Sequence, residues 1–453
     1  MKLDPQLKQD SGYSWVMARL ETSSPFGAAM ARNPAWYGPG QEAELTEELL
    51  RVEQALNWAS AQLETLIHLL SEFHDIRSSF HRHGNAPMDL VELFEVKHFL
   101  LRLERIAQVY AASPLQGVSI VPMDDMLALL DPSGRKLPPF HIEDSFDPAL
   151  ARIRSEKAQV ESLLRTQPDD QLTLRRQELV REEDAAELNA RRRLTAALLR
   201  EKDRFLNAMD ALGQLDLSAA KARLSRKYGC VRPEPGGDAV TLTEMTHPQV
   251  AYSLAEKGRQ FTPVSMRLEL GSTVITGANM GGKSVAVKSV VLNLLLLHTG
   301  FYVFAQAISS PLFHAVHLIG ADGQSVEQGL SSFGAEVKQL DTVLREEKRR
   351  FFFLALDEFA RGTNPREGAA LARALVGHLN GLNCVALMTT HYDGVADAAG
   401  RHYQVAGLDE TTRTIDYRLI LSPPDAPCPQ DALKVCRLLD LDPELLGVFE
   451  QLS

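Results

Sequence analysis

Apolar residues recur at helical spacing through the first half of the chain. From Gln41 to about Phe80 they fall three and four positions apart, as at Leu49, Val52 and Leu56, which is the period of an amphipathic helix. A second strongly apolar stretch of the same kind runs from Met88 to Ala112. The first half of the chain is therefore predicted to be helical.

Two longer helices are expected next, joined by a short turn. The first runs from Ala149 to about Arg165, the turn is Thr166 to Gln171, and the second runs from about Leu172 to Leu212 with a near-heptad apolar seam. At 1.5 Å per residue the second helix would span on the order of 60 Å. Its outer face carries Arg191-Arg192-Arg193. A solvated helix face is the simpler interpretation of that triplet, and a phosphate-binding patch is the alternative.

The pattern changes in the second half, where short runs of consecutive apolar residues replace the helical period. The runs Val274 to Thr276 and Phe351 to Leu356 suit strands that are buried on both faces of a parallel sheet. A helix from Val285 to Leu297 follows the first run, and Tyr403 to Val405 and Tyr417 to Ile420 extend the sheet. This half is predicted to be an α/β domain.

Candidate chemistry stands directly after the first of these strands. Gly277 to Ser284 reads GANMGGKS and fits the phosphate-binding pattern GxxxxGK[ST] between a strand and a helix. Backbone N–H groups and the helix N-terminus favour phosphate there, while Lys283 is expected to reach the β- and γ-phosphates and Ser284 to bind Mg²⁺. The residues expected at the nucleotide are Gly277, Ala278, Asn279, Met280, Gly281, Gly282, Lys283, Ser284 and Val285.

Two carboxylates end the second buried strand. Asp357 and Glu358 would lie beside the phosphate loop, because ligands bind at the carboxyl ends of the strands in open α/β sheets. Asp357 is expected to hold Mg²⁺, and Glu358 is expected to orient or deprotonate the attacking water. Alone, such a strand end could simply be solvated. Combined with the phosphate loop, it predicts a Mg²⁺-dependent ATPase.

Four segments together resemble the ATPase motifs of the MutS family in order and spacing. They are TGANMGGKS, the acidic segment DEFARGTNPREG from Asp357 to Gly368, MTTHY from Met388 to Tyr392, and GLSSFGAE from Gly329 to Glu336, which is similar to the family's signature segment. The resemblance covers about residues 240 to 420. The departures remove no phosphate or metal ligand: Ala278 replaces proline, Val285 threonine, Ala360 glycine, and Asn364-Pro365 a Ser-Thr pair.

The resemblance implies roles that the motifs alone do not assign. His391 would sense the γ-phosphate, and Ser331 would approach the γ-phosphate bound to the opposite subunit. In the family an aromatic residue shortly before the phosphate loop stacks on adenine. Phe261 is the candidate here, and a place in the core is an equally good interpretation. The resemblance thus implies a homodimer with composite sites for ATP and Mg²⁺.

The expected fold class is an α/β P-loop ATPase domain of the ABC type with a parallel-rich sheet, preceded by an all-α core and lever domain with a long antiparallel helical pair. The predicted divisions are an N-terminal segment (1–40), the helical core and lever (41–235), the ATPase domain (236–425) and a C-terminal helical segment (426–453). That last segment, with helices at Asp431 to Leu439 and Pro443 to Leu452, is similar to the family's dimerising helical pair.

Composition bears on the partners of the protein and on its cellular compartment. The 453 residues carry a net charge of −11, with a sequence pI of about 5.7, so the overall balance gives no support to DNA binding. Four cysteines without metal-ligand spacing fit a reducing compartment. No secretory signal and no apolar run of membrane-spanning length is found. A cytoplasmic protein is expected.

Two modules of the repair branch of the family have no match in the sequence. No Phe-x-Glu motif, which reads mismatches in that branch, occurs in the chain, and the turn from Thr166 to Gln171 stands where a DNA-embracing clamp is expected. The chain therefore looks like a reduced member of the family. We expect no specific mismatch recognition, and only weak electrostatic DNA binding through arginines such as Arg191 to Arg193.

The object on which the ATPase acts stays open between two alternatives. The first is nucleic acid, approached through the lever or through a channel in the dimer. The second is a protein partner, which the same motor and lever would remodel. One reduced lineage of the family points to the second alternative, because it is thought to reactivate a cobalamin-dependent lysine aminomutase.

Overall fold

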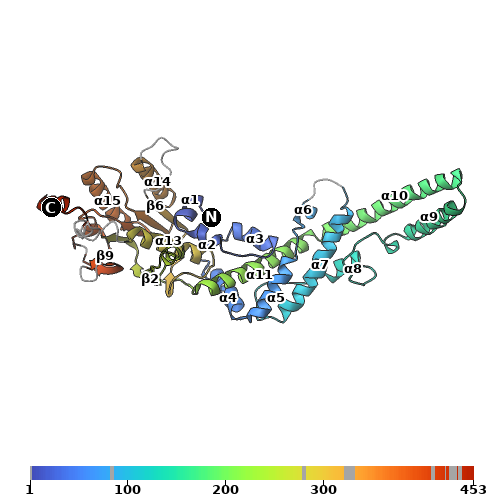
Figure 1. Cartoon of the computed structure of the whole chain (residues 1–453), viewed down its shortest axis with the longest axis horizontal. Helices are drawn as coiled ribbons and strands as arrows, with labels where there is room; N and C mark the ends of the chain where they lie inside the picture. Colours follow the sequence, from blue (N-terminus) through green and yellow to red (C-terminus); the bar gives the residue numbers. More distant parts are fainter. Residues whose placement is uncertain are drawn as a thin grey trace. The chain divides into compact units, whose positions relative to one another are not determined.

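The computed structural model describes residues 3–81, 86–277, 282–320, 332–409, 414–423, 425–427, 436 and 441–452. The chain divides into two compact units. Unit 1 comprises Met1–Glu21, Asn33–Leu56 and Lys221–Ser453, and unit 2 comprises Thr22–Arg32 and Asn57–Ala220 (Figure 1). Among the described residues, no helix is long and apolar enough to cross a membrane.

A six-stranded sheet forms the centre of unit 1, in the order β10-β9-β4-β8-β7-β6. All neighbouring strands are parallel except β10, which pairs antiparallel with β9. Every residue of β4 and β8 is buried, which is why these strands read as continuous apolar runs. The strands are β4 (Gly271–Thr276), β6 (Ala315–Gly320), β7 (Phe352–Asp357), β8 (Cys384–Thr389), β9 (Arg401–Asp409) and β10 (Thr414–Ser422).

Helices cover both faces of this sheet. Alternate residues of β7, such as Leu354 and Leu356, share one apolar cluster with α14 (Ser332–Glu346) and α15 (Pro365–Leu379). Helix α13 (Lys283–His298) contacts β6, β7 and β8 but contributes no residue to that cluster. It therefore covers the opposite face, and 13 of its 16 residues are buried.

The C-terminal end of α13 is fixed by buried polar contacts within unit 1. The Lys221 Nζ donates to Glu48 Oε1 at 2.6 Å and to the carbonyl oxygen of Thr299, one residue past α13, at 3.2 Å. The hydroxyl of Tyr13 donates to Thr299 Oγ1 at 3.2 Å. A buried ammonium at a helix C-terminus also faces the negative end of the helix dipole. These contacts hold α13 at the end opposite its first turn.

Unit 1 also holds a smaller sheet in the order β1-β5-β2-β3. Its members are β1 (Glu234–Pro235), β2 (Val240–Met245), β3 (Val264–Leu268) and β5 (Ala307–Ser310). The remaining helices that begin in this unit are α1 (Pro5–Asp10), α2 (Tyr13–Met17), α4 (Glu42–Asn57), α12 (Pro248–Ala255) and α17 (Pro443–Leu452), with the short turn η3 (Ala396–Ala398).

Unit 2 is helical. An aromatic cluster lies in its core, where the rings of Phe80 and Phe205 stack with centroids 4.5 Å apart and Phe73 meets Phe99 edge-on at 5.4 Å. The elements are α3 (Pro25–Arg32), α5 (Ser60–Ser71), α6 (Arg77–Phe80), α7 (Leu90–Ala111), α8 (Asp124–Leu130), η1 (Asp144–Phe146), α9 (Pro148–Thr166), α10 (Asp170–Arg200) and the part of α11 (Lys202–Tyr228) up to Ala220.

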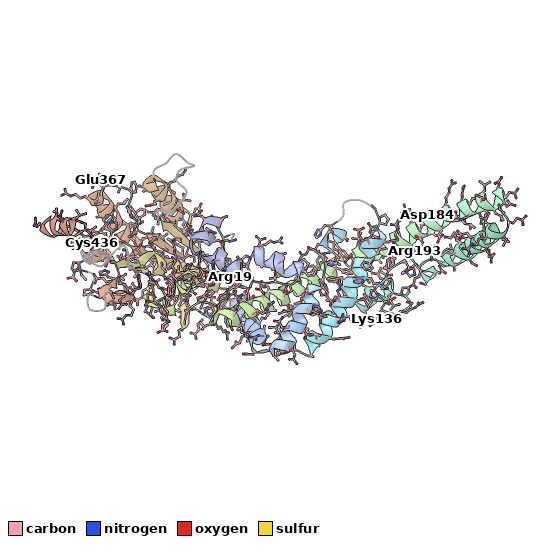
Figure 2. The ribbon with its side chains drawn as sticks, viewed as in Figure 1. Arg19, Lys136, Asp184, Arg193, Glu367 and Cys436 are labelled. Carbon is pink, nitrogen blue, oxygen red and sulfur yellow. The ribbon has the colours of Figure 1, made fainter. Side chains whose placement is uncertain are left out.

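Ion pairs join α9 to α10 within unit 2. Arg154 of α9 contacts Glu183 at 2.9 Å and Glu187 at 2.6 Å on α10, and Arg176 of α10 contacts Glu161 at 2.9 Å. These pairs require the two helices to run antiparallel. Asp184 and Arg193 project from the exposed surface of α10 (Figure 2).

Two expected helices are interrupted. The helix predicted from Gln41 to Phe80 is three helices, since α4 ends at Asn57 and Ala59 has an extended backbone with ψ of 130° before α5. The helix predicted from Leu172 to Leu212 breaks at Glu201, where ψ is 15°, and α11 then continues to Tyr228. The helix predicted at 431–439 lies, except for Cys436, outside the described residues.

Candidate nucleotide site

The candidate site lies where β4, β7 and β8 end together. Asp357 pairs with Thr389 in the register of β7 and β8, and Ile275 pairs with Thr389 in the register of β4 and β8. Parallel pairing therefore brings three carboxyl ends to one edge of the sheet, although the residues come from distant parts of the chain. Gly277 follows β4 at this edge with φ of +140°, and Gly282 precedes α13 with φ of +77°.

The first turn of α13 starts at this edge. Gly282 provides no side-chain cap for the helix, so the N–H groups of the first turn and the positive end of the helix dipole face the site. Lys283 is only 3% exposed. Its Nζ donates to the carbonyl oxygen of Gly277 at 2.7 Å and lies 3.7 Å from Glu358 Oε1. This end of the helix suits an anion.

A hydroxyl and a carboxylate meet beside that helix turn. The Ser284 Oγ donates to Asp357 Oδ1 at 2.9 Å, and the Thr389 Oγ1 donates to the same oxygen at 2.8 Å. The Thr389 hydroxyl in turn accepts from the backbone N–H of Glu358 at 2.9 Å. Hydroxyl and carboxylate oxygens are the donor types that Mg²⁺ prefers. The residues present therefore fit a Mg²⁺ ion at Ser284 and Asp357.

Glu358 lies between two cations. Its Oε1 faces Lys283, and its Oε2 accepts from the Arg361 guanidinium at 2.8 Å. The backbone at Glu358 is in the left-handed region, with φ of +53°, a conformation that non-glycine residues adopt at a cost and that clusters at functional sites. With this backbone conformation the Glu358 Oε1 lies 3.7 Å from Lys283 Nζ.

His391 follows β8 and is half-buried. Burial lowers the pKa of its imidazole below 6.5; nearby Glu358 raises it, and Lys283 and Arg361 lower it further. The ring is therefore neutral at neutral pH. Its Nδ1 is buried without a hydrogen-bond partner among the described residues. Such an atom has hydrogen-bonding capacity for a bound group.

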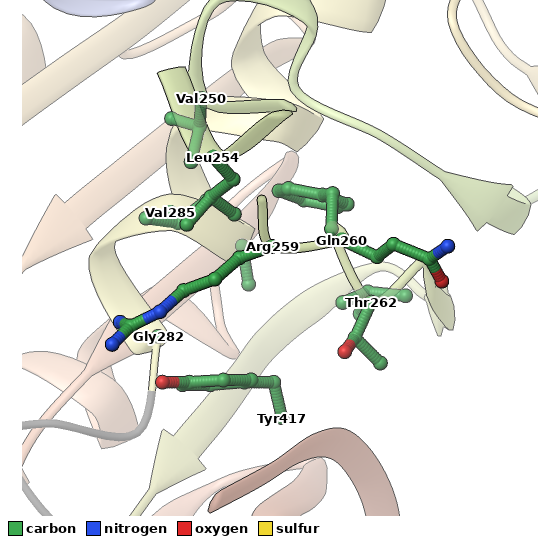
Figure 3. A pocket seen from close by; sticks show the side chains of 11 residues that line it. Val250, Leu254, Arg259, Gln260, Thr262, Gly282, Val285 and Tyr417 are labelled. Atoms are coloured by element: carbon green, nitrogen blue, oxygen red, sulfur yellow. The ribbon is translucent and has the colours of Figure 1, made fainter. Parts of the chain in front are cut away.

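A cavity of about 300 Å³ adjoins the first turn of α13. Figure 3 shows the Arg259 side chain above the ring of Tyr417, beside Gly282. Phe261 and Val285 also line the cavity, so its walls are largely apolar and aromatic, as in sites for planar ligands. The lining is Val250, Leu254, Arg259, Gln260, Phe261, Thr262, Val264, Gly282, Val285, Ala286 and Tyr417.

The structure brings together all of the nominated residues that it describes. At the strand ends these are Gly277, Gly282, Lys283, Ser284, Asp357, Glu358 and His391, and Val285 and Phe261 line the cavity. The others lie outside the described residues: Ala278, Asn279, Met280, Gly281 and Ser331.

Sequence reasoning missed four residues of this region. Thr389 carried a usable signal, because it stands two positions before His391 and parallel pairing places it beside Asp357. Arg361 stands three positions after Glu358. Arg259 and Tyr417 carried none, since only the fold brings these distant segments to one cavity.

Strand β4 leading into Gly277, a helix that starts with buried Lys283 after Gly282, and carboxylates at the end of parallel strand β7, with β8 between the two strands, define the P-loop class of nucleotide-binding domains. Residues 273–422 match the family model described as MutS domain V. This match supports a member of the MutS family, as the motifs predicted, and it covers the part of the chain that holds the candidate site.

Curated relatives agree with this assignment. Endonuclease MutS2 of Thermomicrobium roseum is 33% identical over 275 residues, which cover 57% of this chain and 34% of the relative. The proteins of the same name from Shouchella clausii and Symbiobacterium thermophilum are each 30% identical, over 266 and 267 residues, covering 56% and 57% of this chain and 32% of each relative. The matched part of the chain spans about a third of the length of these relatives.

Proposed function

We propose that the protein binds ATP with Mg²⁺ at this site and hydrolyses it. The observation that carries the proposal is the meeting of Ser284, Asp357 and Thr389 at one oxygen, at 2.9 and 2.8 Å, beside buried Lys283. The hydroxyl comes from α13 and the carboxylate from β7, which is the pairing that holds Mg²⁺ in P-loop nucleotide-binding proteins.

Each residue has one task in this proposal. Lys283 and the first turn of α13 bind the phosphates, and Ser284 and Asp357 hold the metal, which when bound neutralises charge on the phosphate oxygens. Glu358 orients the attacking water and accepts its proton, and its contacts with Lys283 and Arg361 hold the carboxylate in place. His391 contacts the γ-phosphate through a ring nitrogen.

The base of the nucleotide would occupy the cavity beside α13. Phe261 and Tyr417 supply aromatic surface on its walls, and Gly282 joins the cavity to the phosphate end. A planar base buried between apolar and aromatic side chains gains both area and stacking. Replacing Tyr417 by alanine should raise the Kd for ATP while leaving phosphate binding in place.

The proposal includes a homodimer with composite sites, in which Ser331 of one subunit approaches the γ-phosphate bound to the other. An added donor at an already charged cluster would favour the closed pair when ATP is bound. Sedimentation of a Glu358→Gln variant with and without ATP tests this step. A wild-type protein that stays a strict monomer and has full ATPase activity contradicts it.

The hydrolysis proposal is tested by Glu358→Gln. Loss of the proton acceptor should lower kcat roughly 10²- to 10⁴-fold while the Kd for ATP stays near that of the wild type. Lys283→Ala should instead weaken ATP binding itself. Glu346→Gln, at an exposed carboxylate of α14, is the matched control and should change neither quantity. Wild-type turnover in Glu358→Gln would overturn the assignment.

The second part of the proposal concerns the molecule on which the ATPase acts. The relatives are named endonucleases, which favours nucleic acid, but the chain has a net charge of −11. Arg193 of the basic triplet is engaged within unit 2, where it contacts Asp147 at 2.9 Å. We therefore propose weak, electrostatic DNA binding without mismatch specificity, with a remodelled protein partner as the alternative.

Binding to homoduplex, mismatched and branched DNA across a salt series separates these outcomes. Electrostatic binding should fall steeply with salt, because each neutralised phosphate releases counterions, and it should be equal for matched and mismatched duplexes. A tight, salt-resistant preference for a mismatch contradicts the proposal. No DNA binding, together with ATPase stimulation by a protein partner, favours the alternative.

A further inference from the structure

The loop that follows β7 is strained on both sides of Phe359. Glu358 and Ala360 are both in the left-handed region, with φ of +53° and +65°. A non-glycine residue adopts this conformation at a cost in free energy, and the conformation persists only when surrounding contacts determine it. Ala360 is fully buried, so those contacts come from inside unit 1.

Two side chains hold the backbone of Ala360 from both ends. The N–H of Ala360 donates to Glu336 Oε2 at 3.1 Å, and the Tyr392 hydroxyl donates to the carbonyl oxygen of Ala360 at 3.0 Å. We call Glu336 and Tyr392 the Ala360 clamp. Gly368 makes room for it, since a Cβ there would lie 2.7 Å from the Tyr392 hydroxyl oxygen and 2.8 Å from the Ala360 carbonyl oxygen.

Burying the Glu336 carboxyl to hold the Ala360 N–H lowers the stability of the fold. It is 4% exposed, and its Oε1 has no hydrogen-bond partner among the described residues. Burial raises the pKa of this carboxyl, and the hydrogen bond from Ala360 lowers it. A buried carboxyl with a single backbone donor costs stability on balance. A gain in stability therefore does not explain why a carboxyl occupies this buried position.

One clamp residue stands next to a group proposed to contact the γ-phosphate. Tyr392 directly follows His391, and their ring centroids are 4.4 Å apart. Glu336 lies in the first part of α14, five positions after Ser331 in the chain. Tyr392 therefore links the surroundings of His391 to the Ala360 peptide, two residues from Glu358.

We infer that Glu336 and Tyr392 are positioning residues for Glu358: by fixing the Ala360 peptide they aim the Glu358 carboxylate at the attacking water when a γ-phosphate is present. The inference rests on the proposed ATPase function and deepens it. Neither residue touches the nucleotide in this account. Their removal should therefore lower kcat and leave nucleotide binding unchanged.

The experiment measures kcat, KM and the Kd of a non-hydrolysable ATP analogue for Glu336→Ala, Glu336→Gln and Tyr392→Phe. Glu336→Ala and Tyr392→Phe should lower kcat by about 10- to 100-fold, the loss expected from a misplaced catalytic group, with Kd within about twofold of wild type. Glu336→Gln keeps an oxygen acceptor for the Ala360 N–H and should recover most of the activity.

A double-mutant cycle adds a readout that a general structural role would not produce. The kcat losses of Glu336→Ala and Tyr392→Phe should be less than additive in the double variant, because both act on one peptide. Tyr252→Phe, at an exposed tyrosine of α12, is the control and should keep wild-type kcat. Circular dichroism and thermal unfolding confirm that each variant folds.

The outcomes separate the two proposals. A folded wild type that binds but never hydrolyses ATP would overturn the proposed function. An active wild type with unchanged kcat in Tyr392→Phe and Glu336→Ala would overturn the clamp alone, and so would equal losses in kcat and ATP affinity. If Glu336→Ala fails to fold, Tyr392→Phe, which removes one oxygen, decides the question.

Discussion

Helices α13 and α10 are both long, but they differ in how much of each helix is buried. Burial covers 13 of the 16 residues of α13 but only 6 of the 31 residues of α10. The first is held on all sides by the sheet and its surroundings, and the second is held along one side by charged pairs with α9. Helix α13 is therefore enclosed by its own unit, whereas most residues of α10 are exposed or half-buried, and its contacts are limited to neighbours such as α9, α8 and the Met88 N–H, which donates to Thr195 Oγ1.

The largest effect is expected at the buried pair that fixes the end of α13. Lys221→Met leaves Glu48 buried with its main partner removed, and breaking such a pair typically costs about 3–5 kcal/mol. Denaturant unfolding followed in α13 by hydrogen exchange would measure it. The double variant Lys221→Met, Glu48→Gln removes the buried carboxylate that has lost its lysine partner and should recover part of the loss. An equal loss in both would contradict this account.

The same pair predicts a dependence of stability on pH. Burial alone would raise the pKa of Glu48, but Lys221 and Arg51 outweigh burial and hold the pKa below its ordinary 4.5. A carboxyl with a depressed folded-state pKa stabilises the protein above its unfolded value, and this contribution is lost as the pH falls through the folded value. The free energy of unfolding should therefore drop more steeply below pH 4.5 in the wild type than in Glu48→Gln.

A matched pair of leucines sharpens the contrast between the helices. Leu294 of α13 is fully buried, and Leu174 of α10 is 61% exposed. Leu294→Ala should lower the free energy of unfolding by roughly 2–5 kcal/mol, because it removes buried apolar side-chain atoms and leaves a cavity. Leu174→Ala should change the free energy of unfolding by no more than about 0.5 kcal/mol. Thermal and denaturant unfolding of both variants provide the check, and similar losses would show that α10 is packed at Leu174.

The smallest effect is expected from the ion pairs of α10. Arg154→Ala removes contacts with Glu183 and Glu187, but partly exposed pairs contribute little and are screened by salt. Hydrogen exchange along α9 and α10 should speed up slightly at low salt, and the difference should largely vanish near 1 M salt. A salt-independent difference would show that the Arg154 stem packs instead.

The phosphate site was largely readable from the sequence, because burial on both faces marks a parallel strand and the strand ends carry the chemistry. The break in the predicted long helix could not be read from the sequence. No glycine or proline stands near Glu201, and Phe205, four residues on, packs into the aromatic core. Tertiary packing of that kind overrides local helix preference, and no local sequence pattern predicts the resulting break.

The cavity was unreadable for a different reason. Phe261 and Tyr417 are 156 positions apart in the chain, and Tyr417 reaches the cavity on β10, which joins the sheet antiparallel to β9. A single sequence gives no register for such an edge strand. Phe261 could therefore be nominated by position, but its partner could not.

The short turn between α9 and α10 makes this end of unit 2 open to evolutionary exchange. Residues 167–169 are exposed, and the antiparallel pairing of the two helices brings the chain ends on either side of the turn close together. Exposed tips with adjacent ends are the positions where whole domains are inserted or removed with least disturbance. A lineage could gain or lose a module at this turn while α13 and the nucleotide site went on unchanged.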